Sequence, residues 1–215
     1  DIEEEPSNLR TGIKIINLTK SFGAKPAVNK LNLNIFEDQI TILLGHNGAG
    51  KTSTISMLTG MYPPSSGTAY LNGKDIRTEI GEARRSLGLC PQHNILFDEL
   101  TVREHIVFFA RLKGITEAHK ISEEVDRYVN LLGLKEKINA QSGSLSGGMK
   151  RKLSIGIALC GNSKIVICDE PSSGMDPFSR RALWDLLISE KKGRTILLTT
   201  HHMVINFYFS TFSKL

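Results

Sequence analysis

Residues 40–52 read ITILLGHNGAGKT, and they establish the class of fold. The first part, 40–44, is apolar or β-branched and too short for a helix, so it predicts a fully buried strand. The remainder matches the pattern GxxxxGK(S/T), which forms a phosphate-binding loop when it joins a strand to a helix. That helix is expected from about Lys51 to Thr59, with Gly60 as its stop.

The loop carries the groups that a nucleoside triphosphate requires. Glycines let the main chain wrap closely around an anion, and the helix N-terminus adds a favourable dipole. Lys51 supplies a charge for the β- and γ-phosphates, Thr52 a hydroxyl for Mg²⁺ and Ser53 a donor to the α-phosphate. The strand–loop–helix context disfavours the competing interpretation, a glycine-rich turn with a surface lysine. The predicted binding residues are Gly45, His46, Asn47, Gly48, Ala49, Gly50, Lys51, Thr52 and Ser53.

Two adjacent carboxylates, Asp169 and Glu170, follow the apolar run Ile165–Cys168, which predicts a second buried strand. The carboxyl ends of such strands are where α/β sheets bind ligands. Asp169 is a candidate Mg²⁺ ligand, and Glu170 a candidate for orienting the attacking water. An isolated Asp-Glu pair is commonly a solvated turn. Combined with a phosphate-binding loop, the pair predicts phosphoryl transfer.

Strands alternate with helices along the rest of the chain, which predicts an α/β domain with a mainly parallel core sheet. Asn72-Gly73 predicts a hairpin, and Thr101 with Glu104 predicts a capping box at a helix start. Ser122 is expected to cap a further helix that ends at Gly133. Other expected elements are strands at 13–18, 31–35 and 195–199 and a helix at about 148–159.

The composition is that of an ordinary globular domain. The chain has 215 residues, of which 40% are hydrophobic and 23% charged, and this excludes a disordered chain or a fibre. The net charge of +5 is mild, and short basic groups such as Lys150-Arg151-Lys152 are expected on solvated helix faces, which disfavours nucleic-acid binding. Three cysteines without a CxxC pair predict buried free thiols in a reducing compartment. No apolar run approaches the ~18–20 residues of a membrane span, and no signal peptide is visible.

A third motif narrows the interpretation to one family. Residues 145–149 read LSGGM and lie about two dozen residues before the paired carboxylates. This arrangement resembles the signature motif of ATP-binding cassette (ABC) ATPases, which other phosphate-loop families lack. Four further residues resemble landmarks of that family in the expected order: the adenine-stacking aromatic Phe22, the Q-loop glutamine Gln92, the D-loop aspartate Asp176 and the switch histidine His201.

Each landmark has an ordinary interpretation when it is taken alone. Gln92 fits a polar loop residue, Phe22 a core aromatic and His201 a surface residue after a strand. Ser146 with its two glycines fits a helix N-cap. The order and spacing of these residues, taken together, favour the ABC ATPase family over the ordinary interpretations. The sequences GHNGAGKT, LSGGMKRKLS and TTHHM further resemble the A subfamily of ABC transporters, which move lipids. Within that subfamily they look closest to the first cassette of the surfactant-phospholipid transporter type.

The resemblance implies a P-loop NTPase (RecA-like) core with an antiparallel β subdomain and a helical subdomain at about 92–145. It also implies two cassettes that face each other head to tail with ATP between them. The implied catalytic residues are Lys51, Gln92, Glu170 and His201. The implied Mg²⁺ ligands are Thr52, Gln92 and Asp169. Phe22 and Asp176 are implied nucleotide contacts, and Ser146, Gly147 and Gly148 are implied to act on the partner's ATP.

The implied cofactors are ATP and Mg²⁺. The implied partners are a second cassette, the transmembrane domains of a transporter and, indirectly, its lipid substrate, with no nucleic acid. The expected location is the cytoplasmic face of a membrane, with no transmembrane segment in this chain. ATP hydrolysis is expected to drive lipid transport through dimerisation of the two cassettes.

Three segments are expected: an acidic linker at 1–12, the cassette at 13–202 and an atypical tail at 203–215. Because the tail is apolar and aromatic and unlike the family, we expect the C-terminal part to be truncated and the core sheet to lack its last strands. Two other functions stay open. One is a non-catalytic nucleotide-binding fragment that associates with a partner cassette. The other is a DNA-repair or chromosome-organising ABC ATPase, which the short spacing from Lys51 to Leu145 without heptads disfavours.

Overall fold

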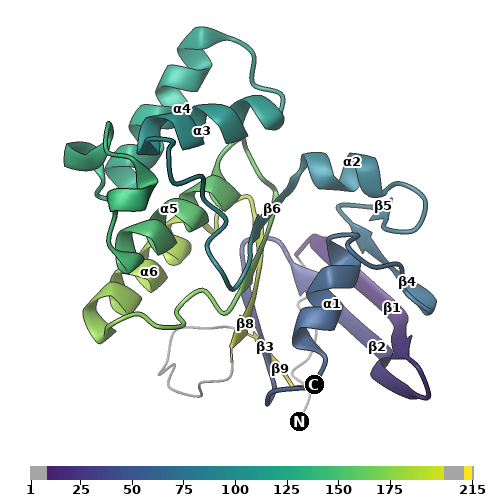
Figure 1. Cartoon of the computed structure of the whole chain (residues 1–215). Helices are drawn as coiled ribbons and strands as arrows, with labels where there is room; N and C mark the ends of the chain where they lie inside the picture. Colours follow the sequence, from purple (N-terminus) through teal and green to yellow (C-terminus); the bar gives the residue numbers. More distant parts are fainter. Residues whose placement is uncertain (1–8, 201–210, 215) are drawn as a thin grey trace.

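The computed structural model describes residues 9–200 and 211–214. An antiparallel and a parallel sheet lie on either side of α1, and the other long helices cover the far face of the parallel sheet (Figure 1). The strands are β1 Thr11–Phe22, β2 Lys25–Phe36, β3 Ile40–Leu44, β4 Ser66–Leu71, β5 Lys74–Asp75, β6 Leu87–Cys90, β7 Ile165–Asp169, β8 Thr195–Thr200 and β9 Thr211–Lys214. The helices are α1 Lys51–Leu58, α2 Ile80–Arg85, α3 Val102–Leu112, α4 Ala118–Leu131, α5 Gly147–Leu159 and α6 Pro177–Glu190, with short 3₁₀ helices η1 Lys135–Lys137 and η2 Ser142–Ser144.

The antiparallel sheet has the strand order β2-β1-β4-β5. The hairpin predicted at Asn72-Gly73 is confirmed, because both residues have positive φ (52° and 82°) and connect β4 to β5. β1 begins at Thr11, two residues before the expected strand, and it runs on to Phe22. Gly12 packs so closely on Thr195 that a Cβ atom would overlap its side chain. β1 therefore takes in the last two residues of the segment expected as a linker.

The parallel sheet has the strand order β6-β7-β8-β3-β9. Its inner strands are buried on both faces, which explains why they read as continuous apolar runs. Ile42 and Val166 pack on the side of α5 and α6. Leu43 and Ile167 pack on the side of α1 and the antiparallel sheet. The predicted mainly parallel core is therefore confirmed.

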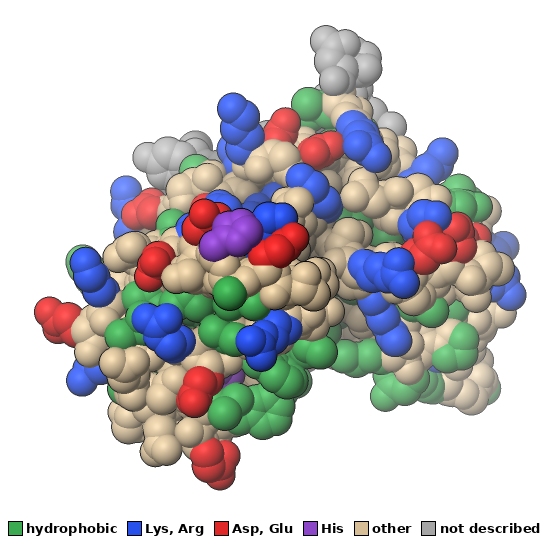
Figure 2. Space-filling view, turned by 90° about the horizontal axis from the view of Figure 1, so that it is seen from above, with side chains coloured by type: hydrophobic (Ala, Val, Ile, Leu, Met, Phe, Trp, Pro, Cys, Tyr) green, Lys and Arg blue, Asp and Glu red, His purple; other side chains and the backbone are tan. Residues whose placement is uncertain are grey.

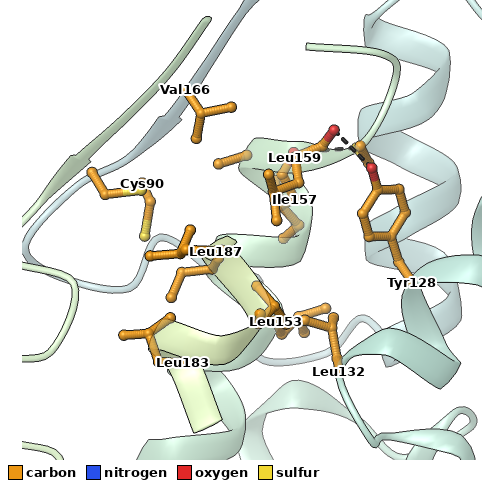
Figure 3. Close-up of a cluster of buried hydrophobic side chains, with 14 of the residues drawn as sticks. Cys90, Tyr128, Leu132, Leu153, Ile157, Leu159, Val166, Leu183 and Leu187 are labelled. Atoms are coloured by element: carbon orange, nitrogen blue, oxygen red, sulfur yellow. Dashed lines mark hydrogen bonds between the residues drawn. The ribbon is translucent and has the colours of Figure 1, made fainter. Parts of the chain in front are cut away.

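The larger of the two hydrophobic clusters lies between the parallel sheet and helices α3 to α6. Figure 3 shows side chains of α5 and α6, among them Leu153, Leu183 and Leu187, in one apolar cluster that Tyr128 of α4 borders on one side. The Tyr128 hydroxyl is fully buried and donates to the Leu159 carbonyl over 2.9 Å. That bond satisfies the one polar atom that the aromatic ring brings into the core.

The helical region differs in part from the expectation. Thr101 caps α3 with the predicted capping box, which includes a bond from Glu104 N to Thr101 Oγ1 of 3.2 Å. The cap predicted at Ser122 is wrong, because α4 already begins at Ala118 and Ser122 lies within it. The earlier start buries Ile121 and gives its N–H a bond to the Glu117 carbonyl.

Within the described part of the chain, Thr211–Lys214 forms a strand, β9, parallel to β3 at the edge of the sheet. The expectation that the core sheet lacks the last strands of the family stays a prediction.

The surface is mixed in character. On the face shown in Figure 2, Lys and Arg side chains are interspersed with Asp and Glu among apolar groups. None of the helices in the described ranges combines the length and apolarity that a bilayer span requires.

Candidate functional site

The loop after β3 has the geometry that its sequence predicts. Gly50 forms the N-cap of α1 with φ 91°, a conformation that L side chains rarely adopt. A Cβ atom at Gly50 would lie 2.4 Å from the Ala27 carbonyl oxygen. Glycine therefore lets the loop pass close to β2, and the first N–H groups of α1 are left without partners inside the helix.

Lys51 is the first residue of α1, and its side chain folds back across the loop. Its ammonium donates to the carbonyls of Gly45 over 2.5 Å and His46 over 3.1 Å. The residue is only 6% exposed. A largely buried cation held by neutral carbonyls is well placed to bind an anion, because its charge is weakly screened by water.

The loop forms one wall of a cavity of about 540 Å³. This volume lies within the usual range for small-molecule sites. Separate segments contribute to the lining: the loop, the start of α1, β2, the segment after β6 and the end of β7. The lining residues are Ala27, Asn47, Gly48, Ala49, Gly50, Lys51, Thr52, Ser53, Gln92 and Glu170.

Asp169 lies at the carboxyl end of β7, next to this cavity. Its Oδ2 accepts a hydrogen bond from the Thr52 hydroxyl over 3.3 Å, and its Oδ1 accepts one from the Thr199 hydroxyl. Both carboxylate oxygens are thus oriented by hydroxyl groups. A hydroxyl and a carboxylate oxygen are the donors that Mg²⁺ prefers, so Thr52 and Asp169 fit that ion.

Glu170 is 7% exposed and lines the same cavity. Its φ is +48°, a left-handed conformation that costs a non-glycine residue about 1–2 kcal/mol. Its N–H donates to Thr199 Oγ1 over 3.1 Å, so Thr199 orients both acids of the pair. Thr199 was expected only as part of a strand, and the sequence carried no signal for this contact.

Comparison with known proteins agrees with this geometry. The family model described as "ABC transporter" matches residues 28–173, more than half of the chain. The chain belongs to the ABC transporter family. Human "Phospholipid-transporting ATPase ABCA3" is 58% identical over 205 residues, and human "ATP-binding cassette sub-family A member 2" is 52% identical over 204. These alignments cover 94% of this cassette but only 12% and 8% of the two relatives. The resemblance to the A subfamily, and to a phospholipid transporter within it, is confirmed.

Solved structures confirm the fold class. The Clostridium perfringens protein cbiO1, titled part of the ABC transporter complex cbiONQ, superimposes with a TM-score of 0.80 at 28% identity and covers 89% of this cassette and 79% of that chain. The dimeric bacterial ABC transporter cassette MJ0796 gives a TM-score of 0.78 at 24% identity, with 89% and 88% covered. Both neighbours share the P-loop NTPase architecture that the sequence predicts.

The signature residues of the cassette lie apart from its own cavity. Ser146 caps α5 by accepting a bond from Met149 N over 3.3 Å, as the sequence predicted, and Ser146 and Gly147 are exposed. Asp176 is exposed and caps α6 by accepting from Ser179 N over 2.9 Å. None of them lines the cavity around Lys51. The structure therefore separates these predicted site residues into two groups. The cavity group lines the cavity around Lys51, and the surface group consists of Ser146, Gly147 and Asp176.

Phe22 stands outside the cavity lining at the end of β1. It is 55% exposed and meets the edge of Tyr62, with ring centroids 6.0 Å apart. Lys20 Nζ lies 5.3 Å from the Phe22 ring and donates to the Pro63 carbonyl over 2.7 Å. Tyr62 had no motif to mark it in the sequence. His201, the predicted switch histidine, lies outside the described residues.

Nothing in the sequence indicated that Arg151 belongs to the site. The basic run 150–152 was expected on a solvated helix face, and this expectation is wrong for Arg151. It is 4% exposed, and its guanidinium reaches segments on both sides of the site. The acceptors are the carbonyls of Pro91, Gln92, Asp169, Glu170 and Pro171 and the side chain of Asn94.

Proposed function

We propose that the cassette binds ATP with Mg²⁺ and hydrolyses it, as one of two cassettes that power a lipid transporter. One observation carries the proposal. A single cavity is lined by Lys51, Thr52, Gln92 and Glu170, and Asp169 is hydrogen-bonded to Thr52 at its side. These are the charges and oxygen donors that phosphoryl transfer needs on one phosphate.

The loop provides the binding part of the mechanism. The N–H groups of the loop and the first turn of α1 donate to the phosphate oxygens, and the helix dipole favours their negative charge. Lys51 exchanges its bonds to Gly45 and His46 for bonds to the β- and γ-phosphates. The adenine base stacks on Phe22, whose exposed ring is supported at its edge by Tyr62.

The acids provide the chemical part. Thr52, Gln92 and Asp169 hold the Mg²⁺, which when bound neutralises charge on the phosphate oxygens. Glu170 orients a water molecule in line with the γ-phosphorus and accepts its proton. The new P–O bond forms as the bond from the γ-phosphorus to the bridging oxygen breaks, giving ADP and phosphate. His201 contacts the γ-phosphate.

The surface group supports a head-to-tail pair of cassettes. Ser146, Gly147 and Asp176 are exposed, and Ser146 and Gly147 begin a helix whose N-terminus suits an anion. They do not line the cassette's own cavity, so they are available to a nucleotide held by a partner cassette. Closure of the pair then completes the site and couples hydrolysis to movement.

The helical region supports docking to transmembrane domains at the cytoplasmic face of a membrane. Large apolar side chains stand exposed there, namely Ile95, Phe97, Phe108 and Leu112, with exposed fractions of 42–66%. The rings of Phe97 and Phe108 lie together, with centroids 5.8 Å apart, and exposed apolar groups of this kind mark protein–protein contacts. Human ABCA3, which is 58% identical, is named a phospholipid-transporting ATPase, and this supports a phospholipid as the substrate of the whole transporter.

Phosphate release by the purified chain, measured against its concentration, tests the proposal. We expect magnesium-dependent turnover that rises faster than linearly with concentration, because two cassettes form one active unit. Turnover that Glu170→Gln leaves unchanged would exclude the proposed site. ATP binding without turnover in the wild-type chain would favour the alternative, a non-catalytic nucleotide-binding fragment that associates with a partner cassette.

A further inference from the structure

The Arg151 guanidinium spans two segments that are distant in sequence. Its Nη1 donates to the carbonyls of Pro91 over 2.6 Å and Gln92 over 3.2 Å, and to the Asn94 side chain over 3.3 Å. Its Nε and Nη2 point the other way, to the turn 169–171 after β7. One edge of the planar guanidinium therefore holds the Q-loop segment that contains Gln92, and another edge holds the carboxyl end of β7 with the residues that follow it.

The bonds to the acidic turn involve the residues that carry the proposed chemistry. Nη2 donates to the carbonyls of Asp169 over 3.0 Å and Glu170 over 3.1 Å, and Nε donates to that of Pro171 over 2.8 Å. These carbonyls flank the left-handed main chain at Glu170, with φ +48°. A strained conformation persists only where its surroundings hold it, and three bonds from one rigid group provide such a hold.

The chemistry of arginine suits this position. Its acceptors here are five main-chain carbonyls and one amide oxygen, and the residue is 4% exposed. A lysine has a single nitrogen at the end of a flexible chain and cannot hold two segments in a fixed relation. The role therefore depends on the shape of the guanidinium as well as on its charge.

We propose that Arg151 is a positioning residue for hydrolysis, which fixes the Gln92 segment and the left-handed Glu170 relative to each other. This inference rests on the proposed ATPase function. Because Arg151 lies on α5, about one and a half turns after Ser146, a shift of the signature helix moves both segments together. The Arg151 side chain does not line the nucleotide cavity, so its loss affects the chemical step more than nucleotide binding.

The kinetic test compares Arg151→Met and Arg151→Lys with Lys152→Met, a matched control on the next, partly exposed residue of α5. We expect kcat to fall about 100-fold in Arg151→Met, the scale of a small misplacement in an active site, and at least about 10-fold in Arg151→Lys. The affinity for a fluorescent ATP analogue should stay within about 3-fold of wild type, because the loop is intact.

If the Met variant does not fold, as judged by circular dichroism, the Lys variant carries the comparison. Wild-type kcat in a folded Arg151→Lys variant would overturn the proposal, and so would an equal loss in Lys152→Met.

A second readout is independent of turnover. Hydrogen–deuterium exchange of the full chain should increase in peptides that cover 91–94 and 169–173 in the Arg151 variants, and it should stay unchanged there in Lys152→Met. Unaltered exchange in either segment would overturn the inference. If the wild-type chain shows no ATP hydrolysis, the proposed function fails, and exchange alone then decides whether Arg151 fixes the two segments.

Discussion

The Thr52 hydroxyl donates to Asp169 Oδ2 over 3.3 Å, although 117 residues separate the two along the chain. This contact joins the phosphate-binding loop to the acidic end of β7. β3 and β7 are not neighbours in the sheet but lie on either side of β8, whose Thr199 holds the other oxygen of Asp169. The sheet order therefore brings the two halves of the site together.

Glu170→Gln is expected to leave ATP bound while hydrolysis nearly stops. Glutamine keeps the shape of the side chain, but it cannot accept the proton of the attacking water. The retained nucleotide can be measured with radiolabelled ATP after rapid gel filtration, and the released phosphate in parallel. Rapid turnover in this variant would remove Glu170 from its assigned role.

Lys51→Ala should weaken ATP binding by about 10- to 100-fold. A charge-assisted hydrogen bond contributes about 1.5–3 kcal/mol, and the variant loses those that Lys51 makes with the phosphates. Equilibrium titration with a fluorescent ATP analogue measures the change, with Lys192→Ala, an exposed lysine outside the site, as control. Equal affinities in the two variants would contradict the assignment of the loop.

Gly50→Ala is expected to destabilise the loop and abolish tight nucleotide binding. The new Cβ atom would meet the Ala27 carbonyl, and a φ of +91° adds a strain of roughly 1–3 kcal/mol. Gly81→Ala is the matched control, because it lies in α2 with open space around it. Thermal melting should show a lower Tm for the first variant only, and a wild-type Tm for Gly50→Ala would show that the loop tolerates a side chain.

Glu190→Ala should lower the free energy of unfolding by about 3–5 kcal/mol, because it leaves a buried arginine without its carboxylate. Glu190 pairs with Arg194, and both side chains are under a tenth exposed; it also accepts two bonds from Arg127 of α4. Urea unfolding measures the loss. Glu82→Ala, which breaks only the exposed pair with Lys74, should leave the midpoint almost unchanged. Similar losses in both variants would argue against a structural role for the buried pair.

The three cysteines should resist a thiol reagent in the folded chain at pH 8 and react once urea unfolds it. All three are buried free thiols, and burial raises the pKa of Cys160 to about 12. The thiolate is the reactive form, so a raised pKa and poor access act in the same direction at Cys160 and Cys168, while the fully buried Cys90 is protected by poor access. Fast labelling in native buffer would show that the core opens readily.

Local features were predictable from sequence, whereas contacts between distant segments were not. The loop at Gly50, the cap at Ser146 and the capping box at Thr101 each depend on residues a few positions apart, so short patterns reveal them. Arg151 lies between two other basic residues on a helix that is buried over most of its length, so neither charge nor periodicity marks it. Tyr62 likewise becomes relevant only where folding places it beside Phe22.

A crystal structure of the Glu170→Gln variant with ATP and Mg²⁺ tests the central claim most directly. We predict the triphosphate along residues 45–53, with Lys51 on the β- and γ-phosphates and the metal bound by Thr52 beside Asp169. A nucleotide bound elsewhere, or a triphosphate with the residue at position 170 turned away from its γ-phosphorus, would contradict the account.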